Sequence, residues 1–161
     1  MVVILFGVAG AGKTVVGRRL AEKLDWKFYD ADQFHPSANI EKMRRGIALT
    51  DEDREPWLER LCVLLHTLKD NTKNAVLACS ALKESYRRRL AIAEAIKLVF
   101  LKADYELVEK RLRERRNHFM NPRLLRSQFE TLEEPEGHVV VVDAKLNPCE
   151  VVNAIRAKLA I

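Results

Sequence analysis

The residues best suited to chemistry stand near the start of the chain, in the stretch Gly7–Thr14, which reads GVAGAGKT. This stretch fits the pattern G-x-x-x-x-G-K-[ST] of a phosphate-binding loop. Glycines let the backbone wrap closely around a phosphate chain, and successive N–H groups then point inward at the anion. Lys13 would reach the β- and γ-phosphates of a nucleoside triphosphate, and the hydroxyl of Thr14 would ligate Mg²⁺. The pattern therefore predicts a nucleotide site that uses magnesium.

The sequence on either side of the loop has the order that such a site requires. The apolar run Val2–Phe6 precedes it, and Val16, Leu20 and Leu24 recur every four residues after it, as on one face of a helix. The positive N-terminal end of that helix would face the phosphates. This context favours a nucleotide site over a chance glycine-rich turn.

A phosphate-binding loop occurs in GTPases, in ATPase motors and in small-molecule kinases. The sequence has no NKxD element of the kind that GTPases use to read guanine, and 161 residues is short for a motor or a helicase. A small kinase remains, so the residues that bind the phosphate acceptor must lie in the rest of the chain.

A pair of carboxylates follows the second predicted strand, in the stretch Asp30–Gly46 (DADQFHPSANIEKMRRG). Ligands of doubly wound sheets bind outside the carboxyl ends of the strands, where this stretch would lie. Asp30 and Asp32 could accept a proton from a substrate hydroxyl or organise water molecules on Mg²⁺. Asp30 could equally cap the next helix, and His35 could bond within its loop or contact a ligand.

The third predicted strand leads into the stretch Cys79–Leu90 (CSALKESYRRRL). No acidic residue ends this strand, although many phosphate-binding-loop proteins carry a Walker B aspartate there. Magnesium would therefore depend on Thr14, on water and on Asp32. Lys83 and Arg87 stand four residues apart, on one side of a helix start, where two cations suit an anionic substrate.

Two further arginines, Arg111 and Arg115, are four residues apart in a predicted helix, and His118 follows them. Arginines on a closing lid often neutralise the charge of a transferring phosphoryl group, although surface positions are the alternative. The polar stretch 115–122 (RRNHFMNP) joins two helical patterns and is typical of a mobile flap.

Strands and helices alternate along the chain, which predicts an α/β fold with right-handed crossovers. Several strand candidates are continuous apolar runs, as expected for strands buried on both faces of a parallel sheet. The predicted strands are Val2–Phe6, Lys27–Tyr29, Ala75–Cys79, Lys97–Lys102 and Val139–Val142. Predicted helices follow the glycine loop, carry the stripe Trp57–Leu68, and span Glu84–Ala95, Asp104–Arg116 and Pro148–Leu159. Pro56 suits a first helical turn, with a capping signal at Thr50-x-x-Asp53 just upstream.

The totals favour one globular domain over residues 1–161, with 48% hydrophobic and 32% charged residues. No apolar run approaches the roughly 20 residues of a membrane span, and the short apolar start lacks a basic leader. Cys62, Cys79 and Cys149 form no CxxC pair, which indicates thiols in a reducing cytoplasm. We therefore predict a cytoplasmic protein with no membrane partner.

The net charge of +5 fits either a nucleic-acid surface or a pocket for small anions. The basic residues cluster without interleaved aromatic residues, so we favour small phosphorylated ligands and predict no nucleic-acid partner.

Taken together, the motifs resemble those of the gluconate kinases (gluconokinases), which belong to the shikimate-kinase-like group of phosphate-binding-loop kinases. The resemblance runs from Val2 to about Asp143 and rests on GVAGAGKT, DADQFHPSANIEKMRRGIALTDEDREPWL, CSALKESYR and RLRERRNHFMNPRLLRSQFETLEEP. The strings HPxxNxxKM, DxDRxPWL and SQFxTLExP are far more specific than the glycine loop, and they single out gluconate.

The resemblance implies ATP-dependent phosphorylation of D-gluconate at its 6-hydroxyl, giving 6-phosphogluconate and ADP. It also implies a three-layer fold, in which helices flank a five-stranded parallel sheet of order 2-3-1-4-5. It further implies a mobile lid over about residues 115–130 and a homodimer.

The resemblance also assigns roles to individual positions. Lys13, Asp32 and Arg115 would be catalytic, with Asp32 contacting the accepting hydroxyl and Thr14 serving as the metal ligand. Nucleotide contacts would come from Gly7, Val8, Ala9, Gly10, Ala11, Gly12, Lys13, Thr14, Arg111 and Arg115. The gluconate side would comprise Asp32, His35, Arg54, Lys83 and Arg87, with His118 and Gln128 approaching from the lid.

Some positions depart from the family pattern. Ala91 replaces the last arginine of the CSALKxxYRxxLR string, and Ala9 and Ala11 replace two serines of the loop. Other acceptors, namely shikimate, another sugar acid or a nucleoside monophosphate, remain alternatives. A nucleotide-binding regulator is a further one, although intact Lys13 and Asp32 argue against it.

Overall fold

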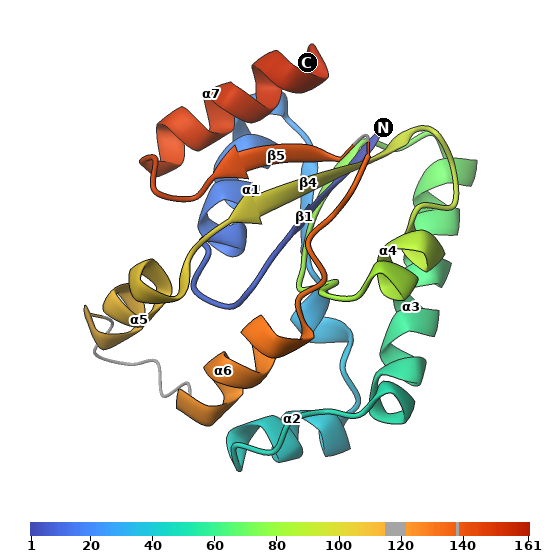
Figure 1. The fold of residues 1–161 in the computed structure, drawn as a ribbon. Helices are drawn as coiled ribbons and strands as arrows, with labels where there is room; N and C mark the ends of the chain where they lie inside the picture. The colour runs from blue at the N-terminus through green and yellow to red at the C-terminus, as the bar shows by residue number, and fades with distance from the viewer. Residues whose placement is uncertain (115–121, 138) are drawn as a thin grey trace.

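The chain folds around one parallel five-stranded sheet of order β2-β3-β1-β4-β5, which confirms the predicted order. The computed structural model describes residues 1–114, 122–137 and 139–161 (Figure 1). The strands are β1 (Val2–Phe6), β2 (Lys27–Asp30), β3 (Ala75–Cys79), β4 (Ile96–Lys102) and β5 (Val140–Asp143).

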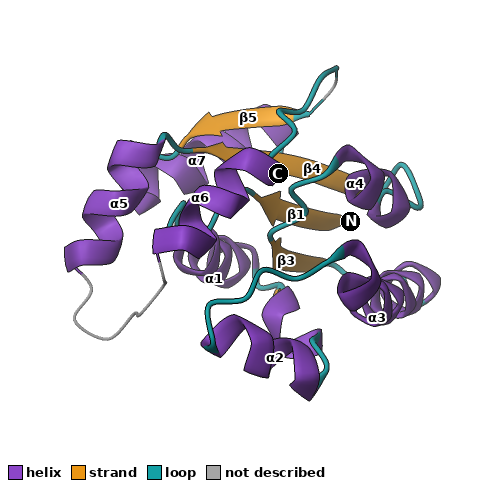
Figure 2. Cartoon of the chain, turned by 60° about the horizontal axis from the view of Figure 1, so that its bottom comes forward, coloured by secondary structure: helices purple, strands orange, loops and turns teal. Residues whose placement is uncertain are grey.

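Helices cover both faces of the sheet and its carboxyl end. They are α1 (Lys13–Leu24), the 3₁₀ helix η1 (Ala31–Phe34), α2 (Ser37–Arg44), α3 (Asp51–Asp70), α4 (Glu84–Leu90), α5 (Tyr105–Glu114), α6 (Pro122–Thr131) and α7 (Pro148–Leu159). Helices α1 and α7 lie on one face, and α3 and α4 on the other (Figures 1 and 2). The result is the predicted three-layer architecture.

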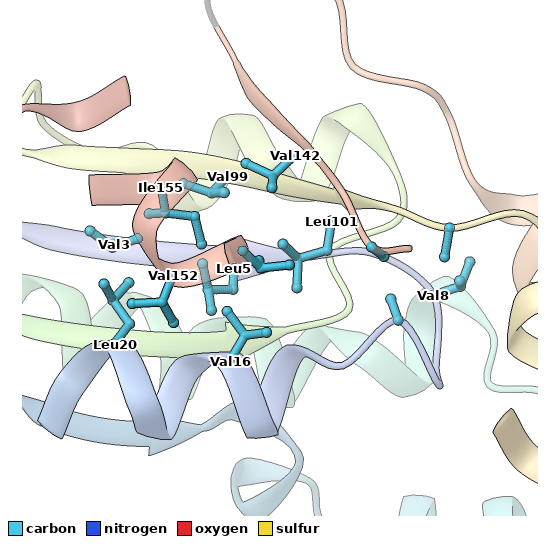
Figure 3. Packing of buried hydrophobic residues seen from close by; sticks show 14 of the residues in the cluster. Val3, Leu5, Val8, Val16, Leu20, Val99, Leu101, Val142, Val152 and Ile155 are labelled. Carbon is cyan, nitrogen blue, oxygen red and sulfur yellow. The ribbon is translucent and has the colours of Figure 1, made fainter. Parts of the chain in front are cut away.

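The alternation of side chains along β1 builds a core on each face. Val3 and Leu5 pack with α1 and α7, in the cluster of Figure 3, whereas Val2, Ile4 and Phe6 pack with α3 and α4. All five residues of β1 are buried, since the strand lies inside the sheet and is covered on both faces. This rigid centre fixes the position of the glycine loop that follows Phe6.

Helix α3 begins at the capping signal that the sequence indicated, about one turn before the start that Pro56 suggested. Thr50 is its N-cap and forms a capping box with Asp53, so Pro56 lies inside the helix in its second turn and not in the first. The acidic first turn also favours a start at Asp51, because carboxylates stabilise a helix N-terminus. The prediction for Pro56 was therefore wrong by about one turn.

Helix α4 is shorter than predicted, because it ends at Leu90 and not at Ala95. The residues that follow turn toward β4, where the Ile96 N–H donates to the Ala93 carbonyl at 3.0 Å. In the predicted lid, Pro122–Thr131 is helical, and the stretch 115–121 lies outside the described residues.

Two expectations from composition concern the chain as a whole. Within the described ranges, no helix has the length and apolar character needed to cross a membrane. Cys62, Cys79 and Cys149 are free thiols, of which Cys79 is buried and Cys149 exposed.

Candidate active site

The functional side chains gather at the carboxyl edge of the sheet, around a cavity of about 290 Å³. The glycine loop follows β1, the acidic stretch follows β2, and Ser80 follows β3. The cavity is lined by Ala9, Lys13, Asp32, His35, Met43, Ile47, Ala48, Leu49, Arg54, Trp57, Ser80, Leu82, Tyr86, Leu124, Ser127, Gln128 and Thr131. Six of these residues, Ala9, Lys13, Asp32, His35, Arg54 and Gln128, are positions that the sequence assigned to ligands.

The glycine loop is shaped by close contacts that only glycine tolerates. Gly7 and Gly10 have φ angles of 143° and 77°. A Cβ atom would lie 2.8 Å from the Leu101 carbonyl oxygen at Gly7, and 2.8 Å from Val108 Cγ1 at Gly10. The loop therefore packs tightly against β4 and α5, which holds it in shape before any ligand arrives.

Lys13 lies inside this loop. Its Nζ donates to the carbonyls of Gly7 and Val8, at 2.9 and 2.8 Å. Burial lowers the pKa of Lys13, and the charge of Asp32 opposes that shift. The ammonium is thus held beside the cavity by two neutral carbonyl acceptors, from which the negatively charged phosphate oxygens could draw it.

Thr14 and Asp30 supply the hard oxygen atoms that magnesium prefers. The Thr14 hydroxyl donates to Asp30 Oδ2 at 3.1 Å, and Asp30 Oδ1 accepts the Asp32 N–H at 3.1 Å. Asp30 therefore caps η1, as one interpretation of the sequence held, and contacts Thr14 as well. No group of three or more His, Cys, Asp or Glu side chains forms a metal cluster within the described ranges. Mg²⁺ usually binds through one or two protein oxygens plus phosphates and water, so this donor set fits it.

Asp32 faces the same cavity. Its side chain keeps contact with solvent through the cavity opening. Loss of hydration beside the surrounding protein nevertheless raises the pKa of Asp32. The positive charge of Lys13 opposes this shift, and the negative charge of Asp30 reinforces it. A carboxylate of raised pKa accepts a proton from a hydroxyl more readily.

His35 is fixed by stacking. Its ring lies 4.8 Å from the Trp57 ring, at an interplanar angle of 7°. The Trp57 Nε1–H donates to the Ala31 carbonyl at 2.8 Å, which locks the indole in place. Both rings line the cavity.

The hydrogen bonds of Asn39 determine the tautomer of His35. Asn39 Nδ2 donates to the Asp53 carbonyl at 2.6 Å, and the same nitrogen lies 3.3 Å from His35 Nδ1. Burial, with help from Arg54, lowers the pKa of His35 to about 4. The imidazole is therefore neutral near pH 7, and since Nδ1 accepts, Nε2 carries the proton. His35 is a hydrogen-bond donor and not a base.

The structure separates the cations that the sequence grouped on the acceptor side. Arg54 lines the cavity, and its closest carboxylate oxygen, on Asp51, is 3.9 Å away. Lys83 is not among the lining residues and donates to Asp51 at 2.7 and 2.8 Å. The Tyr86 hydroxyl also bonds Asp51. Of these two cations, Arg54 is the one that lines the cavity.

Arg87 is also absent from the lining, although the sequence placed it on the acceptor side. Its side chain is 1% exposed. It donates to the carbonyls of Ala81, Leu82 and Glu133 and to the carboxylate of Glu84, at 2.8–3.1 Å. These bonds occupy the five N–H groups of a guanidinium, which leaves none for a ligand.

A second cavity, of about 360 Å³, lies on the other side of the glycine loop. It is lined by Gly10, Ala11, Gly12, Val15, Val16, Arg111, Glu114, Ala144, Leu146, Pro148 and Val151. Arg111 donates to the carbonyls of Gly10, Ala11 and Ala144, at 3.4, 3.3 and 2.6 Å. Arg111 is therefore beside the loop, as predicted, whereas Arg115 and His118 lie outside the described residues.

One face of α6 reaches the first cavity. Leu124, Ser127, Gln128 and Thr131 line it, at the spacing of a single helix face. The sequence prediction named only Gln128, although this spacing could have indicated the others. Trp57 and Tyr86 were also missed as lining residues, because each reads as an ordinary apolar position.

The departures from the family pattern fall in different places. Ala91 is the exposed C-cap of α4 and is not part of either cavity lining. Ala9 lines the first cavity, and Ala11 is buried beside the second. The position of the missing arginine therefore lies outside both cavity linings.

Comparison with known proteins places the chain among sugar-acid kinases. The family model described as shikimate kinase matches residues 9–159. A probable gluconokinase of Xenopus tropicalis is 38% identical, over 99% of this chain and 93% of the relative. The thermosensitive gluconokinase of Escherichia coli (strain K12) is 44% identical, over 83% of this chain and 72% of the relative.

A solved structure agrees with these matches. The crystal structure of a gluconokinase from Sinorhizobium meliloti 1021 superposes with a TM-score of 0.88 at 40% identity, and covers 98% of this chain and 90% of that one. Fold, site and sequence thus agree, and the chain belongs to the gluconokinase family, within the kinases that share the shikimate kinase domain.

Proposed function

We propose that this protein transfers the γ-phosphoryl group of ATP to the 6-hydroxyl of D-gluconate, giving 6-phosphogluconate and ADP. One observation carries the proposal. A single cavity joins Lys13 of the glycine loop and the carboxylate of Asp32 to the cationic Arg54 and the neutral donor His35. Gluconate has one carboxylate and several hydroxyl groups, which need one cation and several hydrogen-bonding side chains.

The acceptor is oriented by the cavity wall. The Arg54 guanidinium would pair with the gluconate carboxylate, and His35 Nε2–H would donate to a hydroxyl oxygen. Ser127 and Thr131 of α6 add further hydroxyl partners. These contacts would place the 6-hydroxyl beside Asp32, at the end of the cavity that holds Lys13.

The transfer itself depends on position and charge. The 6-hydroxyl oxygen attacks the γ-phosphorus, its proton passes to Asp32, and the bond to the β–γ bridging oxygen breaks to release ADP. Lys13 neutralises charge that develops on the phosphoryl oxygens. A Mg²⁺ ion held by Thr14, with Asp30 close by, would supply further neutralisation of the phosphates. Arg111 beside the loop, and Arg115 from the lid, are proposed to act on the nucleotide.

The decisive experiment is a coupled ADP-release assay with Mg-ATP. It compares gluconate with shikimate, related sugar acids and AMP as acceptors. Strong turnover with gluconate supports the proposal. Turnover only with another acceptor would keep the kinase and reject the gluconate pocket, and nucleotide binding without turnover on any acceptor would favour a regulator. Removal of Mg²⁺ with EDTA should abolish turnover.

The wider setting follows from the family resemblance. We infer a single-domain enzyme that assembles as a homodimer, has a closing lid over about residues 115–130, and works in the cytoplasm. Light scattering after gel filtration would test the dimer, since a mass equal to one 161-residue chain would contradict it.

A further inference from the structure

A hydrogen bond joins α6 to the glycine loop at the wall of the first cavity. The Ala9 N–H donates to Gln128 Oε1 at 2.7 Å, between residues 119 positions apart in the chain. Among the described residues, no other side-chain hydrogen bond links α6 to this loop. Both residues line the first cavity, whereas the next loop residues, Gly10–Gly12, line the second. The bond thus stands where the acceptor and the phosphates would meet.

The chemistry of the carboxamide fixes its orientation. An N–H group donates, so the Gln128 oxygen must face Ala9, and the Nε2 group must point elsewhere. Nε2 has two N–H donors, and no partner for them occurs among the described residues. Gln128 can therefore accept from the loop and, at the same time, donate to a hydroxyl oxygen in the cavity.

The position of α6 is set at its far end by the acceptor-side loop. Glu133, just after α6, donates its N–H to the Leu82 carbonyl at 3.0 Å, and its carboxylate accepts the Glu84 N–H at 2.6 Å. Arg87 adds a bond to the Glu133 carbonyl at 2.9 Å. The helix is thus tied to the β3–α4 loop at its end and to the glycine loop at its middle.

We propose that Gln128 is a positioning residue that couples the two substrates, by holding the Ala9 amide with Oε1 while Nε2 donates to a hydroxyl of the bound sugar acid. This inference rests on the proposed function. An ordered acceptor would fix the carboxamide, and the carboxamide would fix the amide at the front of the loop. ATP would then bind a loop that is already arranged, so each substrate would tighten the binding of the other.

The test is a calorimetric titration of the protein with the Mg²⁺ complex of a non-hydrolysable ATP analogue. It is run with and without saturating gluconate. We expect gluconate to lower the Kd of the analogue about fivefold or more in the wild type. Gln128→Met keeps the length of the side chain and removes both hydrogen bonds, so the ratio of the two Kd values should fall to about one. Gln128→Glu keeps an acceptor for Ala9 but loses the Nε2 donors, so it should also lose the coupling.

Arg126→Gln serves as the control, since Arg126 is exposed on the same helix and lines neither cavity. It should keep the wild-type ratio. The ratio is the Kd of the analogue without gluconate divided by its Kd with gluconate. A wild-type ratio of one or below, or a ratio in Gln128→Met equal to that of the wild type, would overturn the inference. Turnover of gluconate would in either case leave the proposed function standing. A wild type that binds the analogue but does not bind or phosphorylate gluconate would reject the proposed function, and the acceptor contact of Gln128 with it.

Discussion

At the scale of single residues, burial decides which side chains of the cavity can exchange a proton. His35 is buried against Trp57 and neutral, whereas Asp32 faces the cavity with a raised pKa and lies under the influence of Lys13. Residue type alone would favour histidine as the base near pH 7. The surroundings disfavour protonation of His35 and favour protonation of the Asp32 carboxylate.

Replacing Asp32 tests this assignment. Asp32→Asn keeps the size of the side chain and removes the base, so kcat should fall about 100-fold or more. The Kd of a Mg²⁺-bound ATP analogue should change little, because the loop contacts of Lys13 remain. Steady-state kinetics and a binding titration measure both values. Near-full turnover in this variant would show that Asp32 is not the base.

The low pKa of His35 predicts a pH dependence of stability. The folded-state pKa of about 4 lies below the ordinary value of 6.5, so between these values the unfolded chain binds more protons. The free energy of unfolding should therefore rise with pH through this window. Above pH 6.5 the stabilisation from neutral His35 should be fully present. We expect wild type to lose about 1–2 kcal/mol more than His35→Gln between pH 7 and pH 4.5, since cavity water screens part of the effect. Urea titrations at both pH values would measure the difference, and equal losses would contradict it.

Variants of Arg54 and Lys83 together test which cation contributes to binding of the acceptor. Arg54→Gln removes the cation that lines the cavity, so KM for gluconate should rise about 10- to 100-fold. Lys83→Gln removes an exposed ion pair with Asp51 and should raise KM less than about fivefold. Initial-rate kinetics with varied gluconate would compare the two. A larger effect at Lys83 would mean that the carboxylate binds outside the cavity.

At the scale of elements, Arg87 holds together the loop after β3, helix α4 and the segment after α6. Ala81 in that loop is buried and has a φ of 38°, which is unfavourable for a residue with a side chain. The Arg87 guanidinium bonds the Ala81 carbonyl and so stabilises this turn. A residue that the sequence suggested as a ligand thus supports the walls of the site instead.

Loss of Arg87 should accordingly destabilise the fold. Arg87→Met would leave the carbonyls of Ala81, Leu82 and Glu133 without their donor, at a cost of about 3 kcal/mol in the free energy of unfolding. Arg88→Met is the control, since the Arg88 side chain is 79% exposed and its removal should cost less than about 0.5 kcal/mol. Urea unfolding would measure both. Equal stabilities would show that the Arg87 bonds carry little energy.

At the scale of the whole molecule, the parallel sheet brings the residues of both cavities together at one edge. Strands β1, β2 and β3 end at the same edge, so the glycine loop, the acidic stretch and Ser80 meet there. Helices α2, α5 and α6 lie around this edge (Figure 2). Ligands that bind there should therefore stabilise the entire domain.

Nucleotide binding should raise the unfolding temperature of the whole domain. A Mg²⁺-bound ATP analogue at 100 times its Kd adds about 2.7 kcal/mol to the free energy of unfolding. Lys13→Ala should lose most of this effect, because the ammonium no longer meets the phosphates. Thermal melts with and without the analogue would measure it, and an equal rise in both proteins would place the nucleotide elsewhere.

Much of the fold and several residues of the candidate site follow from the amino-acid sequence. Continuous apolar runs marked the strands, and the glycine loop, Asp32, His35, Arg54 and Gln128 were identified by local motifs and the family resemblance. Such motifs are readable because the residues that cooperate stand close together in the chain. The capping box of Thr50 and Asp53 was readable in the same way, whereas the place of Pro56 in α3 and the early end of α4 were less readable, because competing local signals decide boundaries.

The sequence by itself determined the glycine loop, the alternation of strands and helices, and the family. Only the tertiary structure decided which of three cations lines the cavity: Arg54 lines it, Lys83 pairs with Asp51, and Arg87 is buried among backbone carbonyls. It also decided that Thr14 meets Asp30 and that Gln128 meets Ala9. The physical reason is that long-range partners, and the burial that sets charge and tautomer, arise only when distant segments pack together.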